Sequence, residues 1–334
     1  VNLFQRGTAS VVRIDELLRQ QPAIADDPAL VRNCHPEPEH RQGEGPASRA
    51  AATATEGNCH PERSEGPASP PLQISGHISF RNLSFTYPTP EGAKPGPQVL
   101  HNISLDIPAG SSLAIVGPTG SGKSSLVSLI PRLQDVPPTE SGQAPLLIDD
   151  QPIRNFPLQT LRQNIGFVPQ ETFLFTDTIA NNIAFGIPSA IQPEILDAAT
   201  TAQIANEILE FPRAFDTLVG ERGITLSGGQ KQRTSIARAV LRNPRILILD
   251  DALASVDTYT EERILTGLRQ VMQGRTTIFI SHRVSTARNA DQIAVLVQGR
   301  IVELGTHDEL LARNGYYTSL AEKQQLEEEL AVTT

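Results

Sequence analysis

The sequence predicts an α/β fold organised around a largely parallel sheet. Five short apolar runs are typical of strands, and helical patterns lie between them, around residues 190–211 and 229–242. The runs span residues 113–116, 146–148, 246–249, 278–280 and 293–297. Strands that alternate with helices indicate a parallel sheet covered on both faces. A glycine-rich turn that joins the first run to a helix at about 123–130 favours the same class.

Length, charge and composition exclude several classes of protein. The 334 residues suffice for two lobes or domains. With 37 acidic and 28 basic side chains, the net charge is −9, which argues against a nucleic-acid binder because such proteins usually carry a basic face. Two cysteines are too few for a disulfide scaffold. No run of about 18 apolar residues exists, so we expect no membrane-spanning segment within this sequence.

The first 73 residues differ from the rest of the chain. The spacing of apolar residues in 1–20 predicts a short amphipathic helix, whereas residues 21–73 lose all periodicity and are rich in Pro, Ala, Gly, Ser, Glu and Arg. Such a composition buries too little apolar area to offset chain entropy, so this range is interpreted as a disordered insert. Two Cys-His pairs, at 34–35 and 59–60, belong to an imperfect repeat and lack the ligand spacing of a zinc site.

Order resumes at Gly76, within a folded unit that we expect to span residues 74–318. The apolar residues of 78–85 predict a pair of strands, and a loop with four prolines follows at 88–97. After the folded unit, residues 319–334 predict a polar helix or tail.

A phosphate-binding loop is the most specific signal in the sequence. Residues 117–124 read GPTGSGKS and match G-x-x-x-x-G-K-[ST] between a strand and a helix. The glycines of such a loop let backbone N–H groups converge on phosphate oxygens at a helix N-terminus. These glycines are Gly117, Gly120 and Gly122. Lys123 would reach the β- and γ-phosphates, and Ser124 would ligate Mg²⁺. A glycine-rich turn with a chance lysine is the weaker alternative.

Two carboxylates follow an apolar strand further along the chain. The run at 246–249 delivers Asp250 to the carboxyl edge of the sheet, beside the phosphate loop. There Asp250 would hold Mg²⁺, a hard ion that prefers oxygen ligands, and Asp251 would face an attacking water. An ordinary turn is the alternative, since Asp is common at strand ends.

A third motif, LSGGQKQR at residues 226–233, indicates a second helix N-terminus. Ser227 can cap a helix that starts near Gly229, and the N-terminus of that helix is free to meet an anion. Taken alone, this motif is equally consistent with a simple cap. Alongside a phosphate loop, however, the four residues become candidate nucleotide contacts. They are Ser227, Gly228, Gly229 and Gln230.

In this order, the three motifs resemble the Walker A, signature and Walker B motifs of an ABC-type ATPase, over about residues 76–315. The resemblance implies a P-loop NTPase fold, with a RecA-like, mostly parallel sheet flanked by helices. It also implies an antiparallel β subdomain and an α-helical signature subdomain at about 171–242. ATP and Mg²⁺ are the implied cofactors, and Ser125 is an implied nucleotide contact.

Four further elements of the family can be carried over. By resemblance, Tyr87 stacks on adenine, Gln170 senses Mg²⁺ and the attacking water, and His282 contacts the γ-phosphate. Residues 254–257 resemble the loop that crosses between two subunits. Taken singly, Tyr87 could be an ordinary aromatic residue at a strand end and His282 an ordinary surface residue. Their joint order favours the functional reading.

The exporter type is suggested by two stretches. Residues 217–223 resemble the segment that touches the cytoplasmic loops of an exporter's membrane partner, and residues 5–14 resemble the linker after an exporter's last membrane helix. The resemblance implies two partners, a transmembrane domain that lies outside this sequence and a second ABC ATPase domain, and it implies no nucleic acid. It places the chain at the cytoplasmic face of a bacterial inner membrane.

Asp251 departs from the family pattern, which has a glutamate general base at this position. The aspartate is one methylene shorter, so its carboxylate would retract by about 1.5 Å. General-base catalysis contributes roughly 10²–10⁴-fold, so we expect ATP binding with slow hydrolysis. Aspartate together with an intact signature resembles one half of a heterodimeric multidrug or lipid exporter, whose partner supplies the glutamate.

Three other functions stay open at this point. A soluble ABC ATPase of DNA repair or translation is disfavoured, because the sequence has no extended heptads and a negative net charge. A non-catalytic module gated by ATP and a decayed transporter fragment are the other two. Specificity for a transported substrate would lie in the membrane helices outside this sequence.

Overall fold

The computed structural model describes residues 24–26, 73–89, 94, 96–136, 142–220 and 223–332. The predicted linker helix at 1–20 and nearly all of the predicted insert at 21–73 lie outside the described residues. Within the insert, Asp26 contacts the folded unit: its Oδ1 accepts the backbone N–H of Leu158 at 2.8 Å and lies 4.0 Å from the Arg132 guanidinium.

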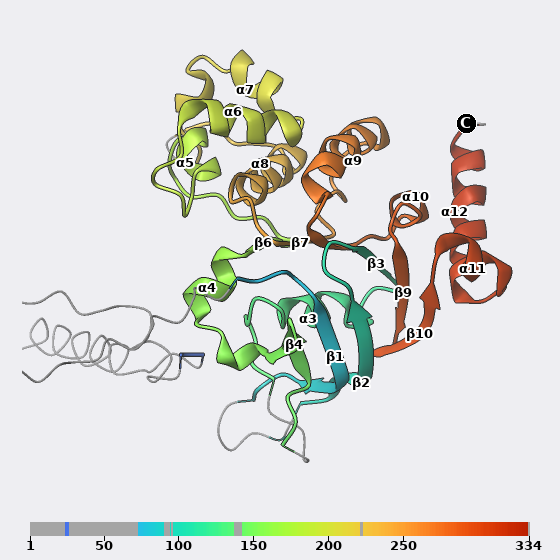
Figure 1. Ribbon diagram of the computed structural model, residues 1–334. Helices are drawn as coiled ribbons and strands as arrows, with labels where there is room; N and C mark the ends of the chain where they lie inside the picture. Colours follow the sequence, from blue (N-terminus) through green and yellow to red (C-terminus); the bar gives the residue numbers. More distant parts are fainter. Residues whose placement is uncertain are drawn as a thin grey trace, which may run out of the picture.

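A six-stranded sheet forms the centre of the fold (Figure 1). Its strands are β3 (Ser112–Val116), β6 (Ile165–Val168), β7 (Ile246–Asp250), β8 (Thr276–Ile280), β9 (Gln292–Val297) and β10 (Arg300–Gly305). The order is β10-β9-β3-β8-β7-β6, and every neighbouring pair is parallel except β9 with β10. Strands β3, β7 and β8 are buried throughout. The predicted α/β class is therefore confirmed, although β6 and β10 were not predicted.

A second, four-stranded sheet forms the antiparallel β subdomain that the resemblance implies. Its order is β2-β1-β4-β5, with β1 (Ile78–Thr86), β2 (Gln98–Ile107), β4 (Leu146–Ile148) and β5 (Gln151–Pro152). The prediction of two strands within 78–85 is wrong, because this stretch is one strand whose main partner is β2. Asn82, with φ 50°, lies at a register shift between Phe80 and Leu83. The shift keeps both apolar side chains on the core face although they are three positions apart.

Four helices form a lobe beyond the β6–β7 side of the large sheet (Figure 1). They are α5 (Ile179–Ile183), α6 (Gln192–Thr201), α7 (Ala205–Glu210) and α8 (Gly228–Leu241). Helices α5 and α6 both pack on α8. The helical pattern predicted around 190–211 divides into α6 and α7 at Gln203, whose φ of 56° ends the first helix. This lobe is the α-helical subdomain of the predicted fold.

The remaining helices flank the sheets. They are α3 (Lys123–Ser128), α4 (Leu158–Gln163), α9 (Thr258–Met272), α10 (Val284–Ala287), α11 (His307–Ala312) and α12 (Tyr316–Val332), with short 3₁₀ turns at Ile153–Asn155 and Ala214–Asp216. The predicted polar helix at 319–334 corresponds to α12. Among the described residues, no helix combines the length and the apolar composition needed to cross a membrane.

The large sheet has a separate hydrophobic core on each face. Strand β7 shows the division, because successive side chains of a strand point to opposite faces. Ile246 and Ile248 join the core between the two sheets, whereas Leu247 and Leu249 join the core beneath the helical lobe. This double burial explains why β7 is apolar without alternation.

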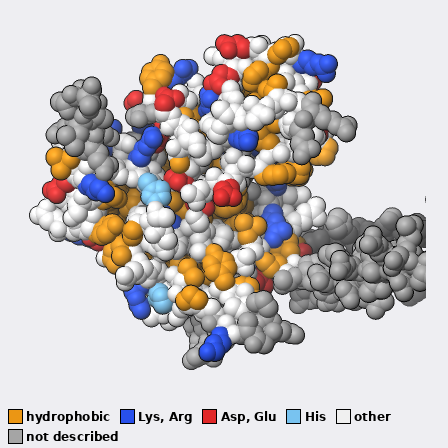
Figure 2. Space-filling model, turned by 180° about the vertical axis from the view of Figure 1, so that it is seen from behind, with side chains coloured by type: hydrophobic (Ala, Val, Ile, Leu, Met, Phe, Trp, Pro, Cys, Tyr) orange, Lys and Arg blue, Asp and Glu red, His pale blue; other side chains and the backbone are white. Residues whose placement is uncertain are grey.

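Figure 2 shows the face opposite to the view of Figure 1. Hydrophobic, basic and acidic side chains are interspersed over the coloured part of that face. Basic side chains do not gather there into one broad patch.

We predict that Ile248→Ala lowers the free energy of unfolding by about 2–5 kcal/mol, because it opens a cavity in the buried core that Ile248 shares with side chains of both sheets. The matched control is Val302→Ala on β10, where the valine is 51% exposed and the expected change is within about 0.5 kcal/mol. Urea denaturation of both variants measures the difference. Equal losses would contradict this assignment of the core.

Candidate nucleotide-binding site

Four neighbouring strands end at one edge of the large sheet, and a candidate residue or loop follows each of them. The phosphate loop follows β3, His282 follows β8, Asp251 follows β7, and Gln170 follows β6. These segments line one pocket. Its lining residues are Val99, Thr119, Gly120, Gly122, Lys123, Ser124, Ser125, Gln170, Asp250, Asp251, Ile280 and His282. The parallel sheet thus brings together residues that lie far apart in the sequence.

The backbone of the phosphate loop requires glycine at its start. Gly117 has φ 146°, and a Cβ atom added there would lie 2.0 Å from the backbone oxygen of Leu296. Gly122, with φ 101°, is the N-cap of α3, which begins at Lys123. Gly120 is also left-handed, at φ 79°, but an added Cβ would meet nothing within 4 Å. The loop therefore follows a tight path between β3 and α3.

Lys123 is buried beneath the loop, with 6% of its surface exposed. Its Nζ donates hydrogen bonds of 2.9 Å to the backbone oxygens of Gly117 and Pro118. Burial lowers the pKa of Lys123, against the raising effect of Asp251 and Asp250. A cation held this way in a pocket fits an anionic group such as a phosphate.

The predicted metal ligands Ser124 and Asp250 are in direct contact. Ser124 Oγ donates to Asp250 Oδ1 at 2.9 Å. Burial raises the pKa of Asp250, although the hydrogen bond from Ser124 opposes this shift. Two adjacent oxygen ligands fit Mg²⁺, which usually keeps waters and substrate phosphates as its other ligands. Among the described residues, no group of three or more His, Cys, Asp or Glu side chains forms a metal site by itself.

The three predicted catalytic side chains lie together, with Gln170 and His282 both near one carboxylate oxygen of Asp251. Asp251 Oδ2 lies 3.5 Å from Gln170 Nε2 and 4.0 Å from His282 Nε2. Asp251 itself has a left-handed backbone, with φ 49°. The arrangement surrounds the carboxylate with an amide and an imidazole, so a water in the pocket could contact all three.

Tyr87 does not line the pocket itself but contacts Ser125, which does. The hydroxyl of Tyr87 is 2.8 Å from Ser125 Oγ, and its ring packs edge-on against Phe85 at 5.0 Å between centroids. Tyr87 remains 43% exposed. An exposed aromatic ring can stack on a flat base, so the adenine contact stays a prediction that this geometry permits.

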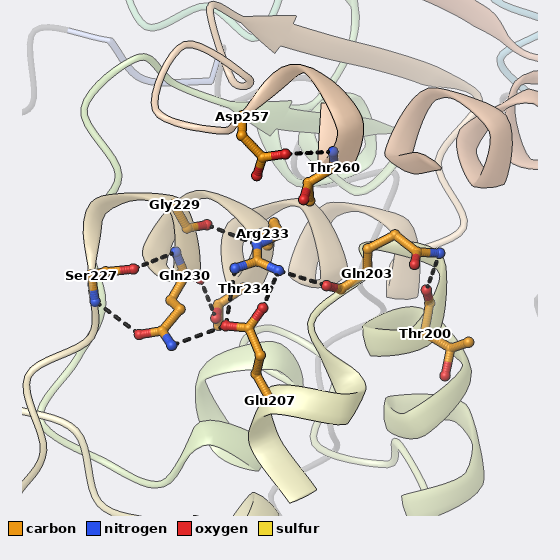
Figure 3. Close-up of polar contacts among 10 residues, drawn as sticks. All are labelled: Thr200, Gln203, Glu207, Ser227, Gly229, Gln230, Arg233, Thr234, Asp257 and Thr260. Atoms are coloured by element: carbon orange, nitrogen blue, oxygen red, sulfur yellow. Dashed lines mark hydrogen bonds and ion pairs between the residues drawn. The ribbon is translucent and has the colours of Figure 1, made fainter. Parts of the chain in front are cut away.

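The signature residues belong to α8 in the helical lobe. Ser227 caps this helix as predicted: its Oγ accepts the N–H of Gln230 at 3.2 Å, and Gln230 Oε1 accepts the N–H of Ser227 at 2.9 Å (Figure 3). Residues 227–230 do not line the pocket. Two of them, Gly228 and Gly229, lie against the loop after Asp251 instead, since a Cβ added to Gly229 would lie 3.0 Å from the Ser255 backbone oxygen. Gln232 Oε1 accepts the Ser255 N–H at 3.1 Å.

Sequence reasoning missed two residues that brace the loop around His282. Gln324 of α12 accepts the backbone N–H of Val284 at 2.7 Å and donates to the backbone oxygen of His282. Glu261 of α9 is buried and accepts hydrogen bonds from the side chains of Arg283 and Thr286. No motif marks either residue. Gln324 lies 42 positions from His282 in the sequence. Glu261 is an acidic residue in the first turn of a helix, where such residues are common.

We predict that Gly117→Ala destabilises the fold more than Gly120→Ala. A left-handed residue with a Cβ costs about 1–2 kcal/mol, which is the expected loss at Gly120. At position 117 the added atom also meets a backbone oxygen of β9, which cannot rotate away. Urea denaturation of the two variants tests this order, and an equal or smaller loss for Gly117→Ala would contradict the described path of the loop.

Comparisons with known proteins find ABC transporters. The family model for ABC transporters matches residues 100–254. The chain is 48% identical over 260 residues to "ABC transporter B family member 6" of Dictyostelium discoideum. This match covers 77% of this chain and 38% of the relative. It is also 48% identical over 259 residues to an "ATP-dependent lipid A-core flippase" of Syntrophus aciditrophicus, covering 77% of this chain and 41% of the relative.

A solved structure of a bacterial Atm1-family ABC exporter with ATP bound has a similar fold, with a TM-score of 0.70 and 42% sequence identity. The match covers 78% of this chain and 44% of that chain. This chain therefore spans less than half the length of these relatives. The chain therefore carries an ATP-binding domain of the ABC transporter type.

Proposed function

We propose that this chain is the ATP-hydrolysing domain that powers an exporter in a membrane. The observation that carries the proposal is the pocket at the sheet edge, where the buried Lys123 lies beside the contact between Ser124 and Asp250. A cation and two hard oxygen ligands, next to a glycine-rich loop, suit a nucleoside triphosphate with its divalent metal.

Each side chain has a role in this proposal. Backbone N–H groups of the loop and Lys123 bind the phosphates, and Tyr87 and Ser125 contact the nucleoside side. Ser124, Asp250 and Gln170 would hold Mg²⁺, which when bound neutralises charge on the phosphates. Asp251 accepts a proton from the attacking water.

Gln170 and His282 complete this part of the proposal. Both lie beside Asp251 Oδ2, at 3.5 and 4.0 Å. We propose that Gln170 orients the water and that His282 contacts the γ-phosphate. In these positions both side chains would act only once a nucleotide is bound.

A second ATPase domain completes the site. The N-terminus of α8 carries the signature residues, yet these residues do not line the pocket of their own chain. A helix N-terminus favours an anion. We infer that residues 227–230 contact the γ-phosphate bound to a second domain, with loop 254–257 between the two sites.

The second domain of the complete transporter is proposed to be a different chain, with glutamate in the position of Asp251. Because the loop and the signature of this chain are both intact, two copies of it should also associate on MgATP when hydrolysis is blocked.

The membrane partner is proposed to dock on an aromatic surface next to Gln170. Phe173, Phe175 and Phe185 form this surface, and Phe173 is 66% exposed. Phe175 stacks on Phe185 at 4.4 Å between ring centroids, and the Arg238 guanidinium lies 5.7 Å from the Phe185 ring. Exposed aromatic groups of this kind mark contact surfaces. Since the match covers only 41% of one exporter and 44% of the other, the occupant we propose is the exporter's transmembrane domain.

This partner would hold the chain at the cytoplasmic face of a membrane. The relatives come from a eukaryote and from a bacterium, so the proposal names the cytoplasmic face of a membrane without specifying a bacterial or a eukaryotic cell.

We predict that Lys123→Ala weakens MgATP binding by at least about tenfold, the usual effect of removing one hydrogen bond to a charged group. Lys94→Ala, which removes an exposed lysine, should leave the affinity unchanged. Calorimetric titration of both variants gives the comparison. Equal affinities would show that this pocket does not bind the triphosphate.

We predict that Asp251→Glu speeds ATP hydrolysis, because the longer side chain brings the carboxylate nearer the γ-phosphate. The gain should reach at least about tenfold, a part of the roughly 10²–10⁴-fold contribution of a well-placed general base. Asp251→Asn should abolish turnover at this site. Steady-state phosphate release from two copies of the chain, in which both sites carry the same residue at position 251, measures both effects. If neither the native chain nor Asp251→Glu hydrolyses ATP while both bind it, the chain is instead an ATP-gated module, the second candidate, which the short Asp251 favours.

A further inference from the structure

A carboxylate of the helical lobe holds the helix that carries the signature residues. Glu207 of α7 lies between Gln230 and Arg233 of α8 (Figure 3). Arg233 donates from Nη1 and Nη2 to the two carboxylate oxygens of Glu207, at 2.5 and 3.0 Å. Such a bidentate pair fixes orientation as well as distance. None of these residues lines the nucleotide pocket.

The same carboxylate fixes the orientation of the Gln230 amide. Gln230 Nε2 donates to Glu207 Oε2 at 3.0 Å, while Gln230 Oε1 accepts the backbone N–H of Ser227. An ionised carboxylate can only accept hydrogen bonds, so the amide must turn its NH₂ group toward Glu207. Its oxygen is thereby left facing Ser227, as the cap requires. Glu207 therefore sets the geometry of Ser227 through Gln230.

Hydrogen bonds and the charge of Arg233 favour the ionised form of Glu207, against the effect of burial. Burial alone would raise the pKa of Glu207, but hydrogen bonds from Arg233 and Gln230 and the Arg233 charge outweigh burial and lower it. Arg233 is itself largely buried, and Nη1 also donates to the Gln203 backbone oxygen at 2.7 Å. The network thus ties the turn between α6 and α7 to the first turn of α8.

We propose that Glu207 is a positioning residue that holds the N-terminus of α8 ready for its ligand. The inference rests on the proposed function for the identity of that ligand, the γ-phosphate bound to a second domain. It adds a residue of α7 that carries no motif and touches no nucleotide. Through this residue, α7 fixes the position of the signature residues at the start of α8.

Backbone amide hydrogen exchange of the nucleotide-free chain tests the positioning role directly. Glu207→Ala should speed exchange at residues 227–231 by about fivefold, the fold-change that matches the loss of one helix cap. Glu207→Gln keeps the shape and one acceptor, so a smaller increase is expected. Glu210→Ala removes the same charge from an exposed position on α7 and should change nothing. Unchanged exchange at 227–231 in Glu207→Ala, or an equal rise at 117–124, would overturn the proposal.

Association on MgATP tests the consequence for the second domain. In an Asp251→Asn background, sedimentation should show two copies associating, and Glu207→Ala should weaken this association about fivefold. MgATP affinity of the single chain should stay unchanged, because the pocket is intact. Equal association with and without Glu207 would contradict the proposal. If the Asp251→Asn parent binds MgATP but does not associate, the proposed second-domain contact fails, while the exchange result still decides the role of Glu207.

Discussion

Parallel pairing of β3, β8, β7 and β6 is the constraint on which the candidate site depends. In the paired register Ile115 and Asp250 both lie opposite Ile280, and Val168 lies opposite Leu249. The four strands therefore end almost level, so the segments that follow them meet at one edge. Ligands of open α/β sheets bind at this kind of edge. The two hydrophobic cores on the faces of the sheet hold that register in place.

The polar groups at this edge are individually unfavourable to bury. Burial shifts the pKa of Lys123 and of Asp250 in opposite directions, each toward its neutral form. Their mutual attraction and the hydrogen bond from Ser124 offset part of this cost. The Lys123 ammonium is held by two backbone oxygens, which are weaker partners than a phosphate anion. The edge is thus arranged so that a triphosphate with its metal improves the balance of charge.

Features that depend on residues close together in the sequence could be predicted, whereas features that depend on distant residues could not. The phosphate loop, the strand before Asp250 and the Ser227 cap are contiguous motifs, and the structure has each of them within one or two residues of its predicted place. The β1 strand was misjudged because the bulge at Asn82 interrupts the alternation that marks a strand.

The supporting contacts could not be predicted at all. The pair Glu207–Arg233 joins positions 26 apart, and the contact of Gln324 with His282 spans 42. Such pairings arise only when α7 packs beside α8, or α12 beside the loop after β8. Common residue types in ordinary helices give no sign of them.

We propose that α8 of one domain completes the nucleotide pocket of another. A disulfide between Thr119→Cys in the pocket and Ser227→Cys at the α8 N-terminus would report this contact, after Cys34 and Cys59 are replaced by serine. We expect a link between two chains that forms with MgATP and not without it. A link within a single chain, or none when MgATP is bound, would show that α8 does not reach the pocket of a second domain.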